Sequence, residues 1–179
     1  LNKEEKKSLF FVPTLTTRNN LKEIINICVK SEKNFLFKFD LLHYSDYLFA
    51  LLSPIRIKKI PFNDFKFNGM NIGPILKADY YRNISNESSF EGILNYLFFK
   101  RLKESGFKLL LVVNWFENQV VDRGFNKGVR DFFPQVCNVG YQGFIIPYNF
   151  FLHFQPSQLG YETGVIPNEI AVVGVGLKN

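Results

Sequence analysis

The sequence predicts an α/β fold, a Rossmann-like three-layer domain with a mostly parallel sheet. The main observation is a strand–helix–strand pattern in residues 107–147. It opens with a continuous apolar run at residues 109–113, which is typical of a strand buried on both faces. A helical pattern and a second apolar run follow, as in two parallel strands joined by a crossover helix. A similar order in residues 9–39 indicates a second such unit.

The crossover helix is predicted from side chains that recur at positions i, i+4, i+7 and i+11, and from a proline that ends it. These residues are Val121, Phe125, Gly128, Phe132 and Pro134. We expect the second strand near residues 136–139. Because successive parallel strands end at the same edge of a sheet, the loops at residues 115–119 and 141–143 should meet at the carboxyl edge. Open parallel sheets bind ligands at that edge.

The first unit is predicted from three local patterns. We expect a short strand at residues 9–12 and a helix that starts at a capping box formed by Asn20 and Glu23. The apolar stripe that packs this helix on the sheet is Leu21, Ile24, Ile25 and Cys28. Alternating Phe side chains at residues 35–39 then predict the next strand.

The middle of the chain has a weaker pattern. Residues 40–52 are apolar on several faces and predict a helix that Pro54 ends. We interpret residues 55–84 as an irregular insertion, because prolines and glycines interrupt it. One short helix is expected within it, at residues 75–81.

A long helix leads into the central unit. It is predicted to start at a capping box formed by Ser88 and Glu91 and to stop at Gly106. Near the end of the chain, a short apolar run predicts another strand. We therefore expect one Rossmann-like domain over residues 1–169, with residues 170–179 as a C-terminal strand or the start of a following unit.

Composition is ordinary for a globular protein, and 179 residues suffice for one core. The net charge is +6, with small basic clusters at residues 3–7 and 56–59. A solvated surface is favoured for these clusters over nucleic-acid contact, so we expect no nucleic-acid partner. The anionic inner face of a membrane also suits them. No apolar run reaches the ~18 residues of a spanning helix, which predicts a cytoplasmic chain or one peripheral to that membrane face.

Several kinds of chemistry are disfavoured by the sequence. Cys28 and Cys137 lie in apolar patterns far apart, which favours free thiols in a reducing compartment. Neither His43 nor His153, the two histidines, has a cysteine or carboxylate at ligand spacing, so we expect no metal site. Phosphate-binding loop, dinucleotide-binding and nucleophile-elbow motifs are absent.

The polar loop after the first central strand holds the candidate catalytic residue, Glu117. A carboxylate at a strand-to-helix junction suits a general base or a ligand contact, although it also suits a helix cap. Asn118 and Gln119 suit hydrogen bonds to sugar hydroxyls, or simple loop polarity. Trp115 is either a platform for a sugar ring or a core residue. Arg123 is a candidate phosphate contact or an ordinary exposed helix residue.

The loop predicted after the second strand adds Tyr141, Gln142 and Gly143 to the candidate substrate-binding residues. A glycine after a strand lets the backbone approach a ligand closely. Gln142 offers both donors and an acceptor. The alternative interpretation is a tight turn that binds nothing.

These motifs resemble a pattern in bacterial surface-carbohydrate biosynthesis proteins. The residues that carry the resemblance are Trp115-Phe116-Glu117-Asn118-Gln119, Arg123, Gly128, Arg130, Pro134, Gly140-Tyr141-Gln142 and the tail from Val165 to Gly174. In that group a W-x-E-N-Q-like motif precedes a helix, and a G-Y-Q-H-like motif follows the next strand. This chain departs from the pattern at Gly143, where a histidine or similar polar residue is expected. The resemblance covers residues 65–176.

The family is related to two-domain glycosyltransferases of the GT-B type, so the resemblance implies an acceptor-side domain like their N-terminal half. It implies a role in surface polysaccharide biosynthesis, with a glycan or lipid-linked acceptor as partner. A donor domain beyond Asn179 would bind the nucleotide sugar, and this chain itself would hold no cofactor. Glu117 would be the base. The alternative is a non-catalytic binding or scaffold module of the same fold.

Overall fold

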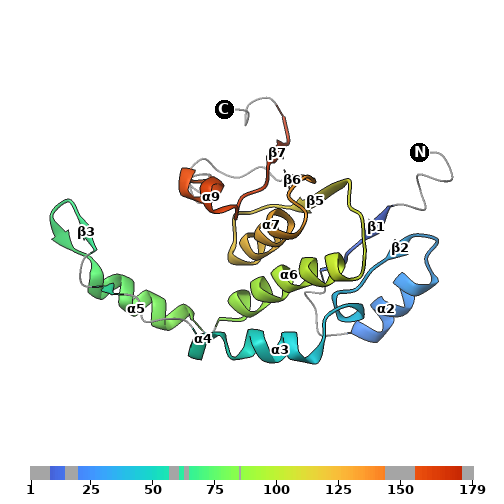
Figure 1. Cartoon of the computed structure of the whole chain (residues 1–179), viewed down its shortest axis with the longest axis horizontal. Coiled ribbons are helices and arrows are strands. Elements are labelled where there is room, and N and C mark those ends of the chain that lie inside the picture. Colours follow the sequence, from blue (N-terminus) through green and yellow to red (C-terminus); the bar gives the residue numbers. More distant parts are fainter. Residues whose placement is uncertain are drawn as a thin grey trace. The chain divides into compact units, whose positions relative to one another are not determined.

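A computed structural model describes residues 9–14, 20–56, 61–62, 65–84, 86–143 and 156–174 of the chain. Figure 1 labels its helices and strands. The chain divides into two compact units, Leu1–Leu42 and His43–Asn179. Each unit has its own pairing of strands.

The first unit contains the predicted parallel strand–helix–strand motif. Strand β1 (Phe10–Phe11) pairs in parallel with strand β2 (Asn34–Phe35), and helix α2 (Leu21–Lys30) lies between them in sequence. The predicted capping box of α2 is wrong. Asn20 precedes the helix in a left-handed conformation, with φ of 61°, and its side chain makes no capping hydrogen bond.

The prediction that the second strand continues to Phe39 is also wrong. The backbone turns there into a short 3-10 helix, η1 (Lys38–Asp40). The Asp40 carboxylate stabilises this turn, because its Oδ2 accepts a hydrogen bond from the Phe37 amide at 3.0 Å. Alternating phenylalanines therefore do not guarantee a strand when an acidic side chain can cap a turn within the same stretch.

The second unit contains the predicted central motif. Strand β5 (Leu111–Trp115), helix α7 (Val120–Phe132) and strand β6 (Cys137–Gln142) follow one another, and strand β7 (Glu169–Val172) pairs with β6. All three strands run parallel, in the order β5-β6-β7. The fold is therefore mixed α/β with small parallel sheets, which confirms the predicted fold class at this coarse level.

One face of this sheet is open. The side chains of Leu111, Val113 and Trp115 on β5 are 57%, 60% and 51% exposed. On the opposite face, Asn138 of β6 is 3% exposed and contacts α7 through Asn126. The continuous apolar run therefore wrongly predicted a strand that is buried on both faces. Within the described residues, β5 is covered on its helix-facing side only.

The core of this unit lies between α6 (Glu87–Glu104) and α7. Glycines let the two helices approach closely, because a side chain at Gly124 would collide with the backbone of Gly92. The Phe99 ring then meets Phe125 edge-on, with ring centroids 4.7 Å apart. This contact confirms that the predicted stripe of α7 faces the protein interior.

The start of α6 differs from the prediction. Asn86 caps the helix, since its Oδ1 accepts a hydrogen bond from the Ser88 amide at 3.0 Å. Ser88 and Glu91 thus lie inside the first turns and do not form the start. The predicted stop is confirmed, because Gly106 follows the helix with a φ of 79°, which glycine adopts without strain.

The region before α6 is more regular than predicted. Helix α3 (Tyr44–Leu51) ends before Pro54, as predicted, although it starts later than residue 40. Pro54 itself lies inside a further helix, α4 (Ser53–Arg56). Strand β3 (Lys66–Phe67) and strand β4 (Met70–Asn71) then form an antiparallel hairpin. Helix α5 (Gly73–Asn83) follows it, and helix α9 (Gln158–Thr163) precedes β7.

Candidate functional site

The ends of β5 and β6 bring the two predicted motifs together. The parallel register pairs Trp115 with Tyr141, so both residues lie on one face at the carboxyl end of their strands. Their rings meet edge-on, with centroids 5.8 Å apart and an interplanar angle of 78°. The predicted meeting of these two segments at one sheet edge is confirmed.

This aromatic pair is accessible to ligands. Trp115 is 51% exposed and Tyr141 is 41% exposed. The alternative interpretation of Trp115 as a core residue is therefore wrong. Gly143 lies directly against both rings. A Cβ atom at this position would approach Tyr141 Cε1 too closely and would lie 2.7 Å from Trp115 Cζ3. A glycine is therefore required for the two rings to adopt this arrangement.

The Glu117 carboxylate fixes the surroundings of the indole. Its Oε1 accepts a hydrogen bond from Trp115 Nε1 at 2.7 Å, and its Oε2 accepts one from Gln119 Nε2 at 2.5 Å. One carboxylate thus holds both neighbouring side chains. Each of its oxygens keeps a second lone pair, with which a carboxylate can accept a hydrogen bond from a ligand.

Asp122 holds the loop that carries Glu117. Its Oδ2 accepts hydrogen bonds from the backbone amides of Glu117 and Gln119, at 2.9 and 3.0 Å. Asn118 between them is left-handed, with φ of 55°. Burial raises the pKa of Asp122, and the two amide hydrogen bonds offset part of that rise. The turn therefore depends on a carboxylate that is partly removed from water.

Two predicted residues, Gln142 and Arg123, lie apart from the aromatic pair. Tyr141 and Gln142 belong to β6, which the sequence wrongly ended at residue 139. Side chains alternate along a strand, so Gln142 lies on the helix-covered face and is only 7% exposed. Gln142 therefore does not share the open face with Trp115. Arg123 is exposed on α7, and its charge acts weakly on Asp122.

Asp122 was not among the predicted site residues, although its position in the sequence indicates a capping role. It stands at the third position of α7, where an acidic side chain can accept from the amide of the capping residue. The resemblance predicted site residues among the five residues before the helix and did not include Asp122. The spacing Gln119-x-x-Asp122 is the pattern that could have found it.

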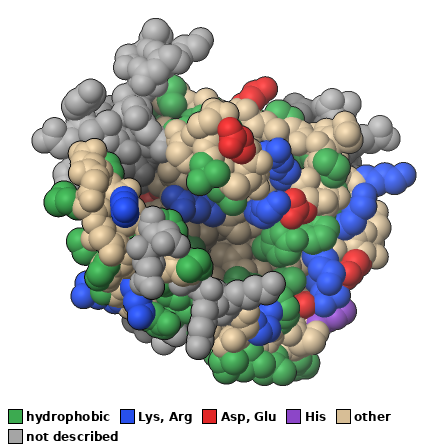
Figure 2. Space-filling view, turned by 60° about the vertical axis from the view of Figure 1, so that its left-hand side comes forward, with side chains coloured by type: hydrophobic (Ala, Val, Ile, Leu, Met, Phe, Trp, Pro, Cys, Tyr) green, Lys and Arg blue, Asp and Glu red, His purple; other side chains and the backbone are tan. Residues whose placement is uncertain are grey.

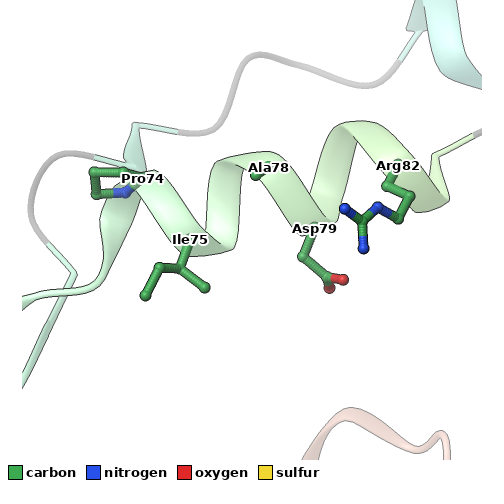
Figure 3. A pocket seen from close by; sticks show the side chains of 5 residues that line it. All are labelled: Pro74, Ile75, Ala78, Asp79 and Arg82. Atoms are coloured by element: carbon green, nitrogen blue, oxygen red, sulfur yellow. The ribbon is translucent and has the colours of Figure 1, made fainter.

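Other features of the surface offer less. Figure 3 shows a shallow pocket on α5 whose lining side chains all come from that single helix. It contains none of the predicted site residues. Among the described residues, no three His, Cys, Asp or Glu side chains cluster as metal ligands would, and His153 lies outside the described residues. None of the helices in this same part of the chain could cross a membrane.

Comparisons with known proteins add no relative. No protein-family model matches the chain, and no curated protein and no solved structure is significantly similar to it. Two exposed rings beside an anchored carboxylate and an amide can take a ligand with one apolar face and several hydroxyl groups.

Proposed function

We propose that this chain binds a carbohydrate acceptor as the acceptor-side domain of a glycosyltransferase-like protein. The observation that carries the proposal is the exposed Trp115 ring, which Glu117 holds by a hydrogen bond and Tyr141 flanks. A pyranose presents C–H groups on its faces and hydroxyl groups around its rim. An aromatic ring suits the former, and carboxylate and amide groups suit the latter.

The resemblance to surface-carbohydrate biosynthesis proteins supports the same assignment. In the family pattern the motif of Trp115 and Glu117 precedes a helix and the motif of Tyr141 follows the next strand, and the parallel register pairs Trp115 with Tyr141. We therefore propose the N-terminal half of a GT-B-type enzyme. A domain beyond Asn179 would bind the nucleotide-sugar donor, and the acceptor would be a glycan or a lipid-linked glycan.

In a catalytic version of this domain, Glu117 would be the general base. Its carboxylate would accept a proton from an acceptor hydroxyl that lies within hydrogen-bonding distance, as that hydroxyl attacks the donor sugar. Asp122 would act only as a positioning residue, because it holds the amides on both sides of Asn118.

The test uses Trp115 itself. It is the only tryptophan of the chain, so its fluorescence reports on the site without a label. We expect acceptor glycans to change this fluorescence saturably, and nucleotide sugars to leave it unchanged. Tyr141→Ala should weaken the response, whereas Phe67→Ala, which removes a more exposed ring from β3, should not. A chain that responds to no glycan would contradict the proposal.

The alternative is a non-catalytic binding module, and one observation favours it. Both Glu117 oxygens already accept hydrogen bonds from Trp115 and Gln119, so the carboxylate can serve to hold the ring alone. A sugar-transfer assay of the longer protein separates the two roles. Loss of transfer in Glu117→Gln at saturating glycan supports catalysis by Glu117, and undiminished turnover removes Glu117 from the mechanism. Glycan binding without any transfer by the unchanged protein supports the binding module.

A further inference from the structure

The buried side chains of helix α3 and of the start of α4 are polar or small. Asp46, Ala50 and Ser53 are only 4%, 1% and 7% exposed, at the spacing i, i+4, i+7 that places them on one face of the α3–α4 segment. A helix on a protein surface ordinarily buries its large apolar side chains and exposes its polar ones. In this segment the orientation is reversed.

An ion pair with α6 fixes the reversed orientation. The Asp46 carboxylate accepts hydrogen bonds from Arg101 Nε at 2.8 Å and Arg101 Nη2 at 2.6 Å, so the pair is bidentate. Asp46 Oδ2 also accepts from the His43 amide at 2.8 Å, which caps the start of α3. Rotating the helix to bury its apolar face would break both bonds to Arg101.

The outward face is consequently apolar. Tyr44, Leu48, Leu51 and Ile55 recur at i, i+4, i+7 and i+11, and they are 96%, 56%, 66% and 81% exposed. Arg56 follows at the end of this stripe. Its guanidinium carbon lies 3.3 Å from the centroid of the Phe49 ring, and its Nη2 donates to the Phe49 carbonyl. We name Tyr44, Leu48, Leu51, Ile55 and Arg56 the α3–α4 surface.

The charge of this surface indicates what it binds. Between residues 43 and 56 the only acidic side chain is Asp46, which is buried and paired with Arg101. The exposed charge is therefore the positive charge of Arg56, on a chain whose net charge is +6. Figure 2 shows that hydrophobic and basic side chains are both well represented on the molecular surface. An apolar stripe with a cation at its end complements an anionic lipid surface.

We propose that the α3–α4 surface docks this protein onto an anionic lipid bilayer. The stripe would lie in the plane of the interface, with its Leu and Ile side chains among the acyl chains and Arg56 at the headgroups. A symmetric contact between two copies is disfavoured, because it would bring the same cationic surface of each copy together. The proposal does not depend on the sugar site at Trp115.

The test measures binding of the full chain to vesicles by co-sedimentation. One vesicle type contains phosphatidylcholine alone, and the other also contains phosphatidylglycerol. We expect binding to the anionic vesicles, weakened by about tenfold or more in the double variant Leu48→Gln, Leu51→Gln. Arg56→Glu should weaken binding to the anionic vesicles and leave any weak binding to neutral vesicles unchanged.

A matched control replaces two leucines elsewhere that are at least as exposed, Leu110→Gln and Leu159→Gln, and should bind like the unchanged chain. Circular dichroism checks folding, and Ile55→Gln alone replaces the double variant if that variant unfolds. Three results would overturn the proposal: no binding to anionic vesicles, full binding by the folded stripe variants, or self-association through this surface without vesicle binding. The response of Trp115 fluorescence to glycans in the same variants tests the sugar site separately.

Discussion

The indole nitrogen of Trp115 donates a hydrogen bond to Glu117 Oε1 at 2.7 Å, which couples the exposed ring to the candidate base. Gln119 donates to the other oxygen of the same carboxylate. A side chain that is 51% exposed would ordinarily sample several rotamers, and this bond restricts it. The orientation of the Trp115 ring therefore depends on Glu117, which the sequence predicted as a general base.

Replacing Glu117 by Gln should loosen the ring. A carboxamide has an NH2 group in place of one carboxylate oxygen, so either Trp115 Nε1 or Gln119 Nε2 would face a donor where it now faces an acceptor. We expect loss of one hydrogen bond, or about 1 kcal/mol, and a glycan affinity that is lower by about fivefold. Near-ultraviolet circular dichroism of the single tryptophan measures the ring, and titration measures the affinity.

The control for this substitution is Glu162→Gln on α9. Glu162 also accepts from a glutamine side chain, Gln158, at 3.0 Å, but it lies in another element. It should change neither signal. An unchanged tryptophan spectrum in Glu117→Gln would show that the hydrogen bond does not hold the ring.

Gly143→Ala should separate the two aromatic rings. The added Cβ would overlap Tyr141 and would lie 2.7 Å from Trp115 Cζ3, so at least one ring has to move. We expect glycan affinity to fall by about tenfold, with a destabilisation of about 1–2 kcal/mol from the overpacked contact. Isothermal titration and urea unfolding measure the two effects.

A second substitution tests whether the rings are the cause. In a Tyr141→Ala background the closest atom to the new Cβ is gone, so Gly143→Ala should then cost less stability than it does alone. If Gly143→Ala lowers stability equally in both backgrounds, the contact with Tyr141 is not the cause, and the loss of stability comes from the backbone. The arrangement also gives a physical reason for the glycine at position 143.

The β5–α7–β6 motif could be predicted from the sequence because the residue patterns that specify it lie within the motif. The apolar run of β5, the stripe of α7 and Pro134 each specify structure over a few residues. The end of β6 was missed because Gly140 resembles a turn residue. In the structure it lies inside the strand, where a Cβ would be 2.8 Å from Phe116 Cβ. Its role depends on a neighbour 24 positions earlier in the sequence.

The exposure of residues was harder to predict than their secondary structure. The alternation of β5 shows which side chains share a face, but a neighbouring helix decides which face is covered. Asp46 and Arg101 are 55 residues apart, so nothing local indicates that α3 is reversed. In contrast, the hairpin turn at Asn68 and Gly69, with φ of 47° and 79°, has a recognised signal that was overlooked within an apparently irregular stretch.

Asn126→Ala should destabilise the second unit. The side chain is fully buried; its Oδ1 accepts from Asn138 Nδ2 at 2.8 Å, and its Nδ2 donates to the Val165 carbonyl at 3.2 Å. Truncation leaves those buried partners unsatisfied, which costs about 2–4 kcal/mol. Urea unfolding measures the loss. Asn83→Ala removes exposed hydrogen bonds to Asp79 and should cost less than about 1 kcal/mol.

Asp122 and Asp46 should make opposite contributions to the pH dependence of stability. Burial raises the pKa of Asp122 in the folded state, so its contribution is full below the ordinary aspartate pKa of 3.8 and is lost as pH rises through the raised value. Hydrogen bonds from Arg101 lower the pKa of Asp46. Its contribution is therefore present above 3.8 and is lost as pH falls through the lowered value.

The two asparagine variants separate these contributions. Relative to the unchanged chain, Asp122→Asn should become less destabilising as pH rises above 3.8, because the charged carboxylate is then the disfavoured form. Asp46→Asn should cost about 3 kcal/mol at neutral pH, because Arg101 then keeps only Glu104 as a carboxylate partner, and it should become less destabilising as pH falls below 3.8. Urea unfolding at a series of pH values measures both slopes. Parallel slopes would mean that the two carboxylates share one environment, which their contacts with backbone amides and with Arg101 argue against.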